Sequence, residues 1–82
     1  MSKFIIFNSI DDADIVNNRI TDNVKVNWVD GITNKYSQPI KHPEQNLWAL
    51  VIDDNYKQYF TQEEINNSVE LTNDWFVINV IT

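Results

Sequence analysis

The chain has 82 residues, a formal net charge of −6 at pH 7 and no cysteine. We expect one domain over residues 1–82, and the lack of cysteine excludes disulfides, thiolate catalysis and cysteine-based zinc sites. The acidic balance argues against direct binding to a nucleic-acid backbone, because such binding needs clustered Lys and Arg. Three Trp, three Tyr and four Phe supply apolar surface for a small domain that folds without a metal or a cofactor.

The first part of the chain predicts a strand followed by an amphipathic helix. Residues 3–7, KFIIF, form a β-branched and aromatic run typical of a buried strand. Ser9 is the expected N-cap of the helix, with Asp12 as its capping-box partner, and the helix should end near residues 21–23. Its apolar stripe consists of Ile10, Ala13, Val16 and Ile20. Because acidic residues directly follow a short apolar run, we expect neither a signal peptide nor a membrane span.

The middle of the chain predicts a hairpin and then a strongly apolar strand. Residues 23–29, NVKVNWV, alternate between apolar and polar side chains and predict a half-buried strand. The pair Asp30-Gly31 contains the only glycine and fits a tight turn, which would send residues 33–40 back as a second strand. His42 then lies in a polar loop, and residues 47–52, LWALVI, predict a buried strand.

The last third predicts a capped helix and a closing strand. Thr61 and Glu64 match a capping box, and Phe60 and Ile65 stand at the positions of a hydrophobic staple around the same helix start. The helix should be short. Residues 75–81, WFVINVI, are apolar on both faces and predict the last strand.

These elements predict one small α+β domain in the order β-α-β-β-(β)-α-β, with an antiparallel sheet of four or five strands and two helices on one face. The first and the last strand are both apolar on both of their faces. Since the helices cover only one side of the sheet, the other side would leave an apolar patch in water. We therefore expect that face to meet a second copy of the chain, giving a homo-oligomer, or a partner protein. Loops that fold over it are the alternative.

No residue pattern predicts a catalytic or a metal site. His42 has no cysteine and no glycine-elbow serine to serve, so we interpret it as a solvent-exposed loop residue. Asp53 and Asp54 follow an apolar strand, as carboxylates do in Mg²⁺ sites, but one glycine cannot build a phosphate-cradling loop. Residues 11–14, DDAD, lack the spacing of a calcium loop and suit a helix start. We expect the protein not to be an enzyme.

Candidate partner-binding residues come from aromatic and apolar positions in the last third of the chain. Tyr56 and Tyr59 stand in a polar stretch, and amphipathic aromatic side chains near a surface are favoured anchors at protein interfaces. Trp75, Val77 and Ile81 share one face of the predicted last strand. We predict that these residues contact a protein partner, with no direct contact to nucleic acid or membrane.

The segments KFIIFNS at the start, IKHPEQNLWALVI in the middle, YFTQEEI and DWF resemble a loose group of small phage-encoded proteins. Those proteins are mostly uncharacterised, and their genes lie near tail and tail-fibre genes. The resemblance spans most of the chain. It implies an accessory protein, either a tail-associated component or a helper of tail-fibre assembly, whose partner is a phage structural protein. It also implies a location in the host cytoplasm, with incorporation in the virion as a further expectation.

An acidic inhibitor of a host nucleic-acid-processing or defence enzyme is the alternative function. An acidic protein can imitate the spacing of phosphates and occupy a basic groove. The side chains that would stand in for the phosphates are Asp11, Asp12, Asp14, Asp53, Asp54, Glu63 and Glu64. Against this hypothesis, the acids are spread along the chain. A Mg²⁺-dependent phosphoryl-transfer enzyme that uses Asp53 and Asp54 is the third hypothesis.

Overall fold

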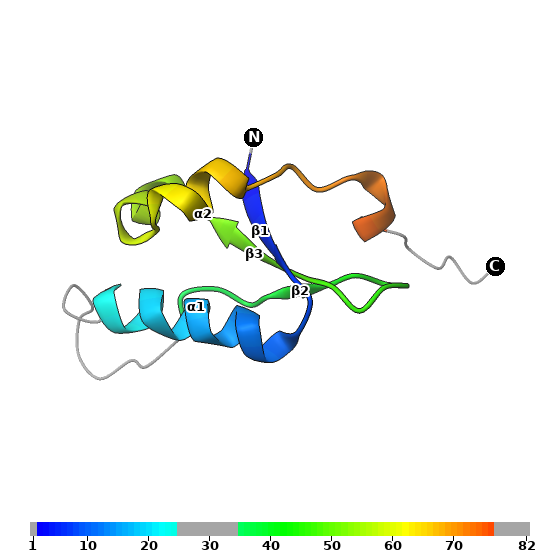
Figure 1. Cartoon of the computed structure of the whole chain (residues 1–82), viewed down its shortest axis with the longest axis horizontal. Helices are drawn as coiled ribbons and strands as arrows, with labels where there is room; N and C mark the ends of the chain where they lie inside the picture. The colour runs from blue at the N-terminus through cyan, green and yellow to red at the C-terminus, as the bar shows by residue number, and fades with distance from the viewer. Residues whose placement is uncertain (1, 25–34, 77–82) are drawn as a thin grey trace.

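The protein is built on an antiparallel sheet, seen in a computed structural model that describes residues 2–24 and 35–76 (Figure 1). Strand β1 (Lys3–Phe7) and strand β2 (Ile40–Lys41) lie on either side of strand β3 (Trp48–Ile52). The described residues therefore form a small α+β fold around a three-stranded sheet of order β1-β3-β2.

The central position of β3 follows from its composition, WALVI. A continuous apolar run is typical of a strand that is buried on both of its faces. Ala49 and Leu50 point to opposite faces, and both are 0 % exposed. β1 pairs with β3 along its whole length, whereas β2 contributes only two residues.

The pairing between β2 and β3 is short because the side chain of Tyr36 forms hydrogen bonds with the backbone at the end of β3, at the position where β2 would continue. Pro39, directly before β2, has no N–H to donate to a strand ladder. Beyond it, the Tyr36 hydroxyl donates to the carbonyl of Val51 at 2.7 Å and accepts the N–H of Asp53 at 2.8 Å. One tyrosine thus satisfies two of the backbone groups that a longer β2 would have paired.

Helix α1 (Ile10–Val24) starts directly after Ser9, the predicted N-cap, and among the described residues only one half of the expected capping box with Asp12 forms. The hydroxyl oxygen of Ser9 accepts the N–H of Asp12 at 3.1 Å, so Ser9 is the N-cap. The helix ends at Val24, just beyond the expected end at residues 21–23. Of the expected apolar stripe, Ala13 and Ile20 are buried and Val16 is partly buried, whereas Ile10 is 38 % exposed. The buried residues of the helix also include two polar ones, and the full set is Ala13, Asn17, Ile20, Thr21 and Val24.

The two buried polar residues of α1 hold the chain that leads to β2. Asn17 is 0 % exposed; its Nδ2 donates to the carbonyl of Ser37 at 2.6 Å, and its Oδ1 accepts the N–H of Ser37 at 3.3 Å. The hydroxyl of Thr21 donates to the carbonyl of Asn17 at 2.7 Å and accepts the N–H of Tyr36 at 2.9 Å. These buried polar groups all have partners, so the hydrogen bonds offset the cost of desolvation and hold Tyr36 on the helix.

Among the described residues, the chain after β3 forms three short helical segments: the 3₁₀ helix η2 (Asp54–Tyr59), helix α2 (Gln62–Asn67) and the 3₁₀ helix η3 (Asn73–Phe76). The predicted capping box of α2 is confirmed. The Thr61 hydroxyl accepts the N–H of Glu64 at 3.1 Å, and the Glu64 carboxylate accepts the N–H of Thr61 at 2.8 Å.

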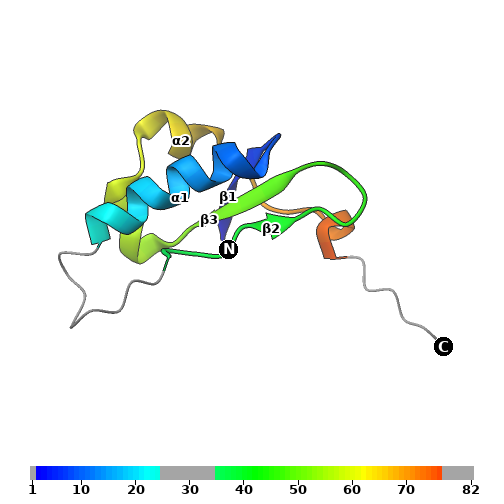
Figure 2. The ribbon, with the colours of Figure 1, turned by 90° about the horizontal axis from the view of Figure 1, so that it is seen from below.

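The main core lies between one face of the sheet and the helices, with α1 running alongside β3 (Figure 2). Both staple residues reach this core, because Phe60 is buried in it and Ile65 packs against it. Side chains of β1 and β3 that point to this face, Ile5 and Leu50 among them, meet α1 there. The buried members of the core cluster are Ile20, Val24, Leu50, Ile52 and Phe60.

The residues that follow α2 run along the outer edge of β1 and on to the hairpin of β2 and β3 (Figure 1). Val69 forms an antiparallel bridge with Phe4: the Phe4 N–H donates to Val69 at 2.7 Å, and the Val69 N–H donates back at 2.8 Å. Farther along, the ring of Trp75 packs against His42 at the hairpin. Phe4 points away from the main core and stays half-buried beside this segment.

The expectation of four or five strands exceeds what the described residues show. Asn23 and Val24, expected to begin a strand, belong to α1, because Val24 continues the buried stripe one turn beyond Ile20. Residues 35–39 of the second expected strand are not in a strand, since the Tyr36 hydroxyl occupies the edge that they would have paired. Ile40, the last residue of that expected strand, does lie in β2, whereas residues 25–29 and 33–34 of the two expected strands lie outside the described residues.

The closing strand expected at residues 75–81 is wrong at its start. Trp75 and Phe76 belong to η3, where the N–H of Trp75 donates to the carbonyl of Thr72 at 3.1 Å. The Thr72 hydroxyl also donates to the carboxylate of Asp74. Such local side-chain bonds compete with strand pairing and favour a turn. Residues 77–81 lie outside the described residues.

Candidate functional site

Large exposed apolar side chains gather beside β1. In the described part of the chain, Phe76 is 55 % exposed and Val69 is 43 % exposed. A shallow hollow of about 230 Å³ lies between the start of β1 and Phe76, and its lining residues are Ser2, Phe4, Glu70, Leu71 and Phe76. We call these lining residues together with Val69 the apolar groove. Apolar surface that stays in water at such a groove marks an interaction site more often than a scattered single residue does.

β1 presents an open edge to the apolar groove. The N–H and C=O of Phe4 point away from β3, because they bond to Val69. Backbone groups of alternate residues in an antiparallel strand point the same way, so those of Ile6 face the same edge. Val69 is the only partner of β1 on that edge among residues 2–24 and 35–76. An open strand edge beside apolar side chains is where an extended peptide can add to a sheet.

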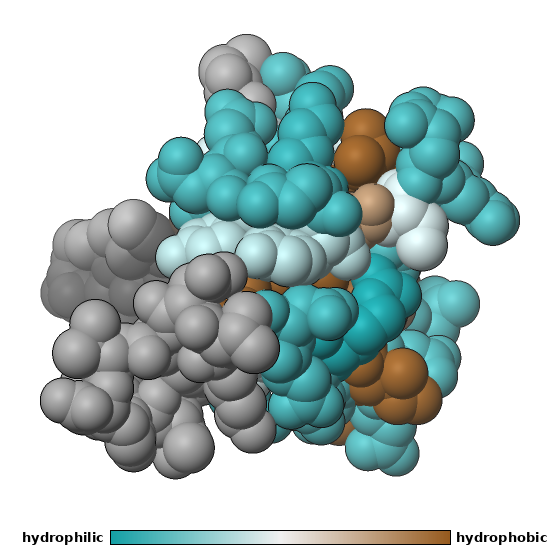
Figure 3. All heavy atoms as spheres, turned by 90° about the vertical axis from the view of Figure 1, so that its left-hand side faces the viewer, coloured by the Kyte–Doolittle hydropathy of each residue, from teal (hydrophilic) through white to brown (hydrophobic). Residues whose placement is uncertain are grey.

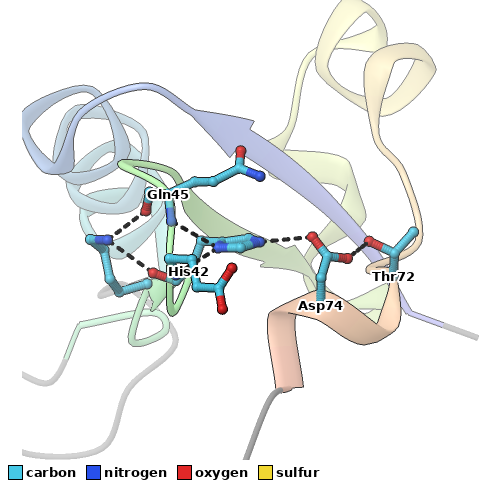
Figure 4. A network of polar contacts seen from close by, with 6 residues as sticks. His42, Gln45, Thr72 and Asp74 are labelled. Atoms are coloured by element: carbon cyan, nitrogen blue, oxygen red, sulfur yellow. Dashed lines mark hydrogen bonds and ion pairs between the residues drawn. The ribbon is translucent and has the colours of Figure 1, made fainter.

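A buried histidine ties the hairpin to the segment that carries Phe76 (Figure 4). His42 is 2 % exposed, so the expectation that it is a solvent-exposed loop residue is wrong. Its Nδ1 accepts the N–H groups of Glu44 and Gln45, both at 3.0 Å, and its Nε2 lies 2.8 Å from Oδ2 of Asp74. An Nδ1 that accepts hydrogen bonds carries no proton. The proton of the ring is therefore on Nε2, which donates a hydrogen bond to the carboxylate of Asp74.

The carboxylate of Asp74 completes this contact. The hydrogen bond from His42, followed by that from the Thr72 hydroxyl, holds the pKa of Asp74 below its usual range. The ring of Trp75 packs edge-on against His42, with the ring centroids 4.8 Å apart. Both ring nitrogens of His42 are engaged, so the arrangement is suited to holding two segments together and leaves neither nitrogen directed at a substrate.

Sequence reasoning missed the pair of His42 and Asp74 because they lie far apart in the chain. One local signal was present. His42 directly precedes Pro43, and a turn that begins there leaves the N–H groups of the next residues in need of an acceptor. The imidazole Nδ1 supplies that acceptor.

The structure separates the predicted partner-binding residues. Tyr56 and Tyr59 are half-buried on η2, pack against the core cluster, and stack with ring centroids 6.5 Å apart. Trp75 is only 8 % exposed and packs in the histidine contact instead. Two further predicted residues lie outside the described residues, namely Val77 and Ile81.

Several acidic residues have structural partners. The Asp53 carboxylate caps η2 by accepting the N–H of Asn55 at 2.9 Å. Glu64 pairs with Arg19 of α1. Burial raises the pKa of Glu64, but the hydrogen bonds from Arg19 and from the N–H of Thr61 outweigh burial and leave the pKa below its usual range. In the described ranges, no three His, Asp or Glu side chains lie close enough together to hold a metal ion.

The side of the molecule that carries η2, α2 and the end of α1 is largely hydrophilic (Figure 3). A pale band of intermediate hydropathy and small hydrophobic areas interrupt it. None of the helices described here has both the length and the hydropathy to cross a membrane.

The two features that bear on function are the apolar groove and the His42 contact that holds the segment bearing Phe76. No protein-family model, no curated protein and no solved structure matches the chain.

Proposed function

We propose that the protein is a non-enzymatic accessory protein that binds an extended segment of a partner protein in the apolar groove. The observation that carries this proposal is the open edge of β1 beside the exposed side chains of Val69 and Phe76. Strand addition at such an edge supplies affinity through backbone hydrogen bonds, here at Ile6, and specificity through side-chain pockets.

The charge of the groove defines the chemistry of the partner. Glu70 is the one charged residue among the described residues that line it, and the whole chain carries a net charge of −6. A segment with alternating apolar side chains and a Lys or Arg placed to meet Glu70 therefore fits best. The bond between His42 and Asp74 holds one wall in place before binding, which lowers the entropy lost when the partner binds.

The proposal includes the phage context that the resemblance to small phage proteins implies. In that context the partner is a phage structural protein, and the chain is a tail-associated component or a helper of tail-fibre assembly in the host cytoplasm. Quantitative mass spectrometry of purified particles distinguishes the two. A fixed copy number relative to the tail proteins supports a virion component, whereas absence from particles despite abundance in infected cells supports an assembly helper.

A matched pair of surface variants tests binding in the groove. Phe76→Ser removes the most exposed apolar side chain of the groove, and Ile15→Ser removes one that is 67 % exposed on α1, away from it. Each variant and the wild type serve as bait in an extract of infected cells. We expect one protein to be retained by the wild type and by Ile15→Ser and to be lost with Phe76→Ser.

The retained protein then supplies a peptide for the decisive measurement. A synthetic extended segment of it should shift the amide NMR signals of Ile6 and Phe4, because the backbone groups of Ile6 are open on that edge and Phe4, which is paired with Val69, is the next residue along the same edge. Equal retention by both variants, or a peptide that binds without shifting these signals, would contradict the proposal. Binding of a second copy in the groove is the other outcome, and light scattering behind a sizing column at high protein concentration detects it.

The acidic-inhibitor hypothesis has weaker support. Asp53 and Glu64, two of the side chains that would imitate phosphates, are engaged in a helix cap and in an ion pair. That hypothesis predicts a host enzyme that is retained at low salt and released at moderate salt, because the contacts are electrostatic. Binding in the apolar groove should weaken much less, so the same retention experiment at two salt concentrations separates the hypotheses.

A further inference from the structure

A pocket on the core-facing side of β1 gathers two of the six basic residues of the chain, Lys3 and Lys57. It lies where the start of β1 meets η2 and the end of α2. Its volume is about 350 Å³. We call it the lysine pocket. Lys3 and Phe4 point to opposite faces of the sheet, so the lysine pocket is separate from the apolar groove.

Neither ammonium group in the lysine pocket forms an ion pair with a described residue. The other basic side chains of the described part all have partners. Arg19 pairs with Glu64, and Lys35 lies 3.7 Å from a carboxylate of α1. Lys41 donates to two backbone carbonyls of the hairpin loop. In a chain with twice as many acids as bases, two unpaired lysines in one pocket create a local site for an anion.

The rest of the lining adds an apolar wall and further polar groups. Ile52 and Ile65 belong to the core or pack against it, and both line the pocket. The Asn66 Oδ1 accepts a hydrogen bond from Gln62 at 2.9 Å, and the Nδ2 of Asn66 donates to no described residue. Five of the seven lining residues are polar, so the lining is mostly polar with one apolar patch at Ile52 and Ile65, and the volume of about 350 Å³ lies at the small end of the range for small-molecule sites.

We propose that the lysine pocket binds a small organic anion, with its carboxylate or phosphate group between Lys3 and Lys57 and its apolar body on Ile52 and Ile65. Asp54 also lines the pocket and reduces its positive potential. A singly charged carboxylate therefore fits better than a doubly charged phosphate. The inference does not depend on the proposed function, because it uses other residues and another face of β1.

NMR titration of the full chain with butyrate, and separately with phenyl phosphate, at constant ionic strength tests the site. Saturable shifts are expected at the amides of Lys57 and Asn66. Lys3→Gln and Lys57→Gln should each weaken binding by about three- to tenfold, the size expected for losing one partly exposed charge contact. Lys35→Gln changes the net charge equally but lies outside the pocket, so it should bind as the wild type does.

Asp54→Asn should tighten the binding of both anions and should favour phenyl phosphate more, because the repelling carboxylate is gone. If only butyrate shifts these signals, the site binds carboxylates. If only phenyl phosphate shifts them, the site binds phosphates. The proposal fails if neither compound gives saturable shifts in the pocket at about 20 mM, a concentration well above ordinary weak affinities. It also fails if Lys35→Gln loses as much affinity as Lys57→Gln.

Discussion

The Tyr36 hydroxyl donates to the carbonyl of Val51 at 2.7 Å and thereby closes the edge of β3 where β2 stops. The same oxygen accepts the N–H of Asp53, and Thr21 of α1 holds the backbone of Tyr36 in place. A side chain thus protects one strand edge of the sheet. The outer edge of β1 has only the bridge to Val69 among the described residues, which is why the two edges differ as places for a partner to bind.

Tyr36→Phe should lower the free energy of unfolding by about 1–3 kcal/mol, because it leaves the carbonyl of Val51 and the N–H of Asp53 without a partner. The ring is retained, so its edge-on contact with Tyr56, at 5.5 Å between centroids, remains. Urea unfolding measures the change. Tyr56→Phe removes a hydroxyl from a neighbouring ring and is the control; equal losses in the two variants would contradict the role given to the Tyr36 hydroxyl.

Stability should fall in alkaline solution partly through Tyr36. Burial raises the pKa of Tyr36 above its usual 10.0 and outweighs the lowering effect of the hydrogen bond from the backbone of Asp53, and the nearby charge of Asp53 adds a smaller increase. A raised folded-state pKa means that this contribution is complete below pH 10 and is lost as the pH rises through the folded-state value. Unfolding measured at increasing pH should show a shallower decline for Tyr36→Phe than for the wild type. Parallel declines would speak against the assignment.

His42→Phe should destabilise the protein by about 2–4 kcal/mol, because it leaves two loop N–H groups without their acceptor and removes the bond to Asp74. The fluorescence of Trp75 should shift toward that of a solvated indole as its packing partner changes. Gln45→Ala is the control, since only the backbone of this exposed residue takes part in the described contacts. A stable His42→Phe variant with unchanged fluorescence would show that the contact does not hold the segment.

Acid should weaken the same contact through Asp74. Its lowered folded-state pKa means that its contribution is present above the usual value of 3.8 and is lost as the pH falls through the folded-state value. Between about pH 5 and that point, the wild type should therefore lose more stability than Asp74→Asn does. Thermal unfolding across this pH range checks the difference. If the two proteins lose stability in parallel, Asp74 does not carry the effect.

The helix starts could be predicted from the sequence because their causes are local. Ser9 bonds to an N–H three positions on, and Thr61 and Glu64 satisfy each other over the same distance. Residues only three positions apart can form these hydrogen bonds whatever the fold of the rest of the chain. The capping pattern in the sequence is therefore sufficient to predict where each helix starts. The apolar run around Leu50 likewise indicated the central strand.

The contacts that define the rest of the fold join distant segments and leave no local pattern. Val24 fits both a helical stripe with Ile20 and an alternating strand, and only packing against the core decides for the helix. The hydrogen bond between Asn17 and Ser37 likewise joins two distant segments and has no local sequence pattern. Of the candidate site, Phe4 was recognisable as an apolar residue on a two-faced strand, but its meeting with Val69 depends on how the whole chain folds.

β1 forms most of its backbone hydrogen bonds with β3, in a register that places Lys3 opposite Ile52. Its partner strand is therefore distant in the sequence. During synthesis, β1 must therefore wait until more than half of the chain has been made before it can form its hydrogen bonds. Loop closure over such a separation is slow compared with the formation of a helix such as α1. Until then Ile5 and Phe7 lack the strand and the core against which they pack in the folded chain, and apolar strand residues exposed in this way favour aggregation of a partly made chain.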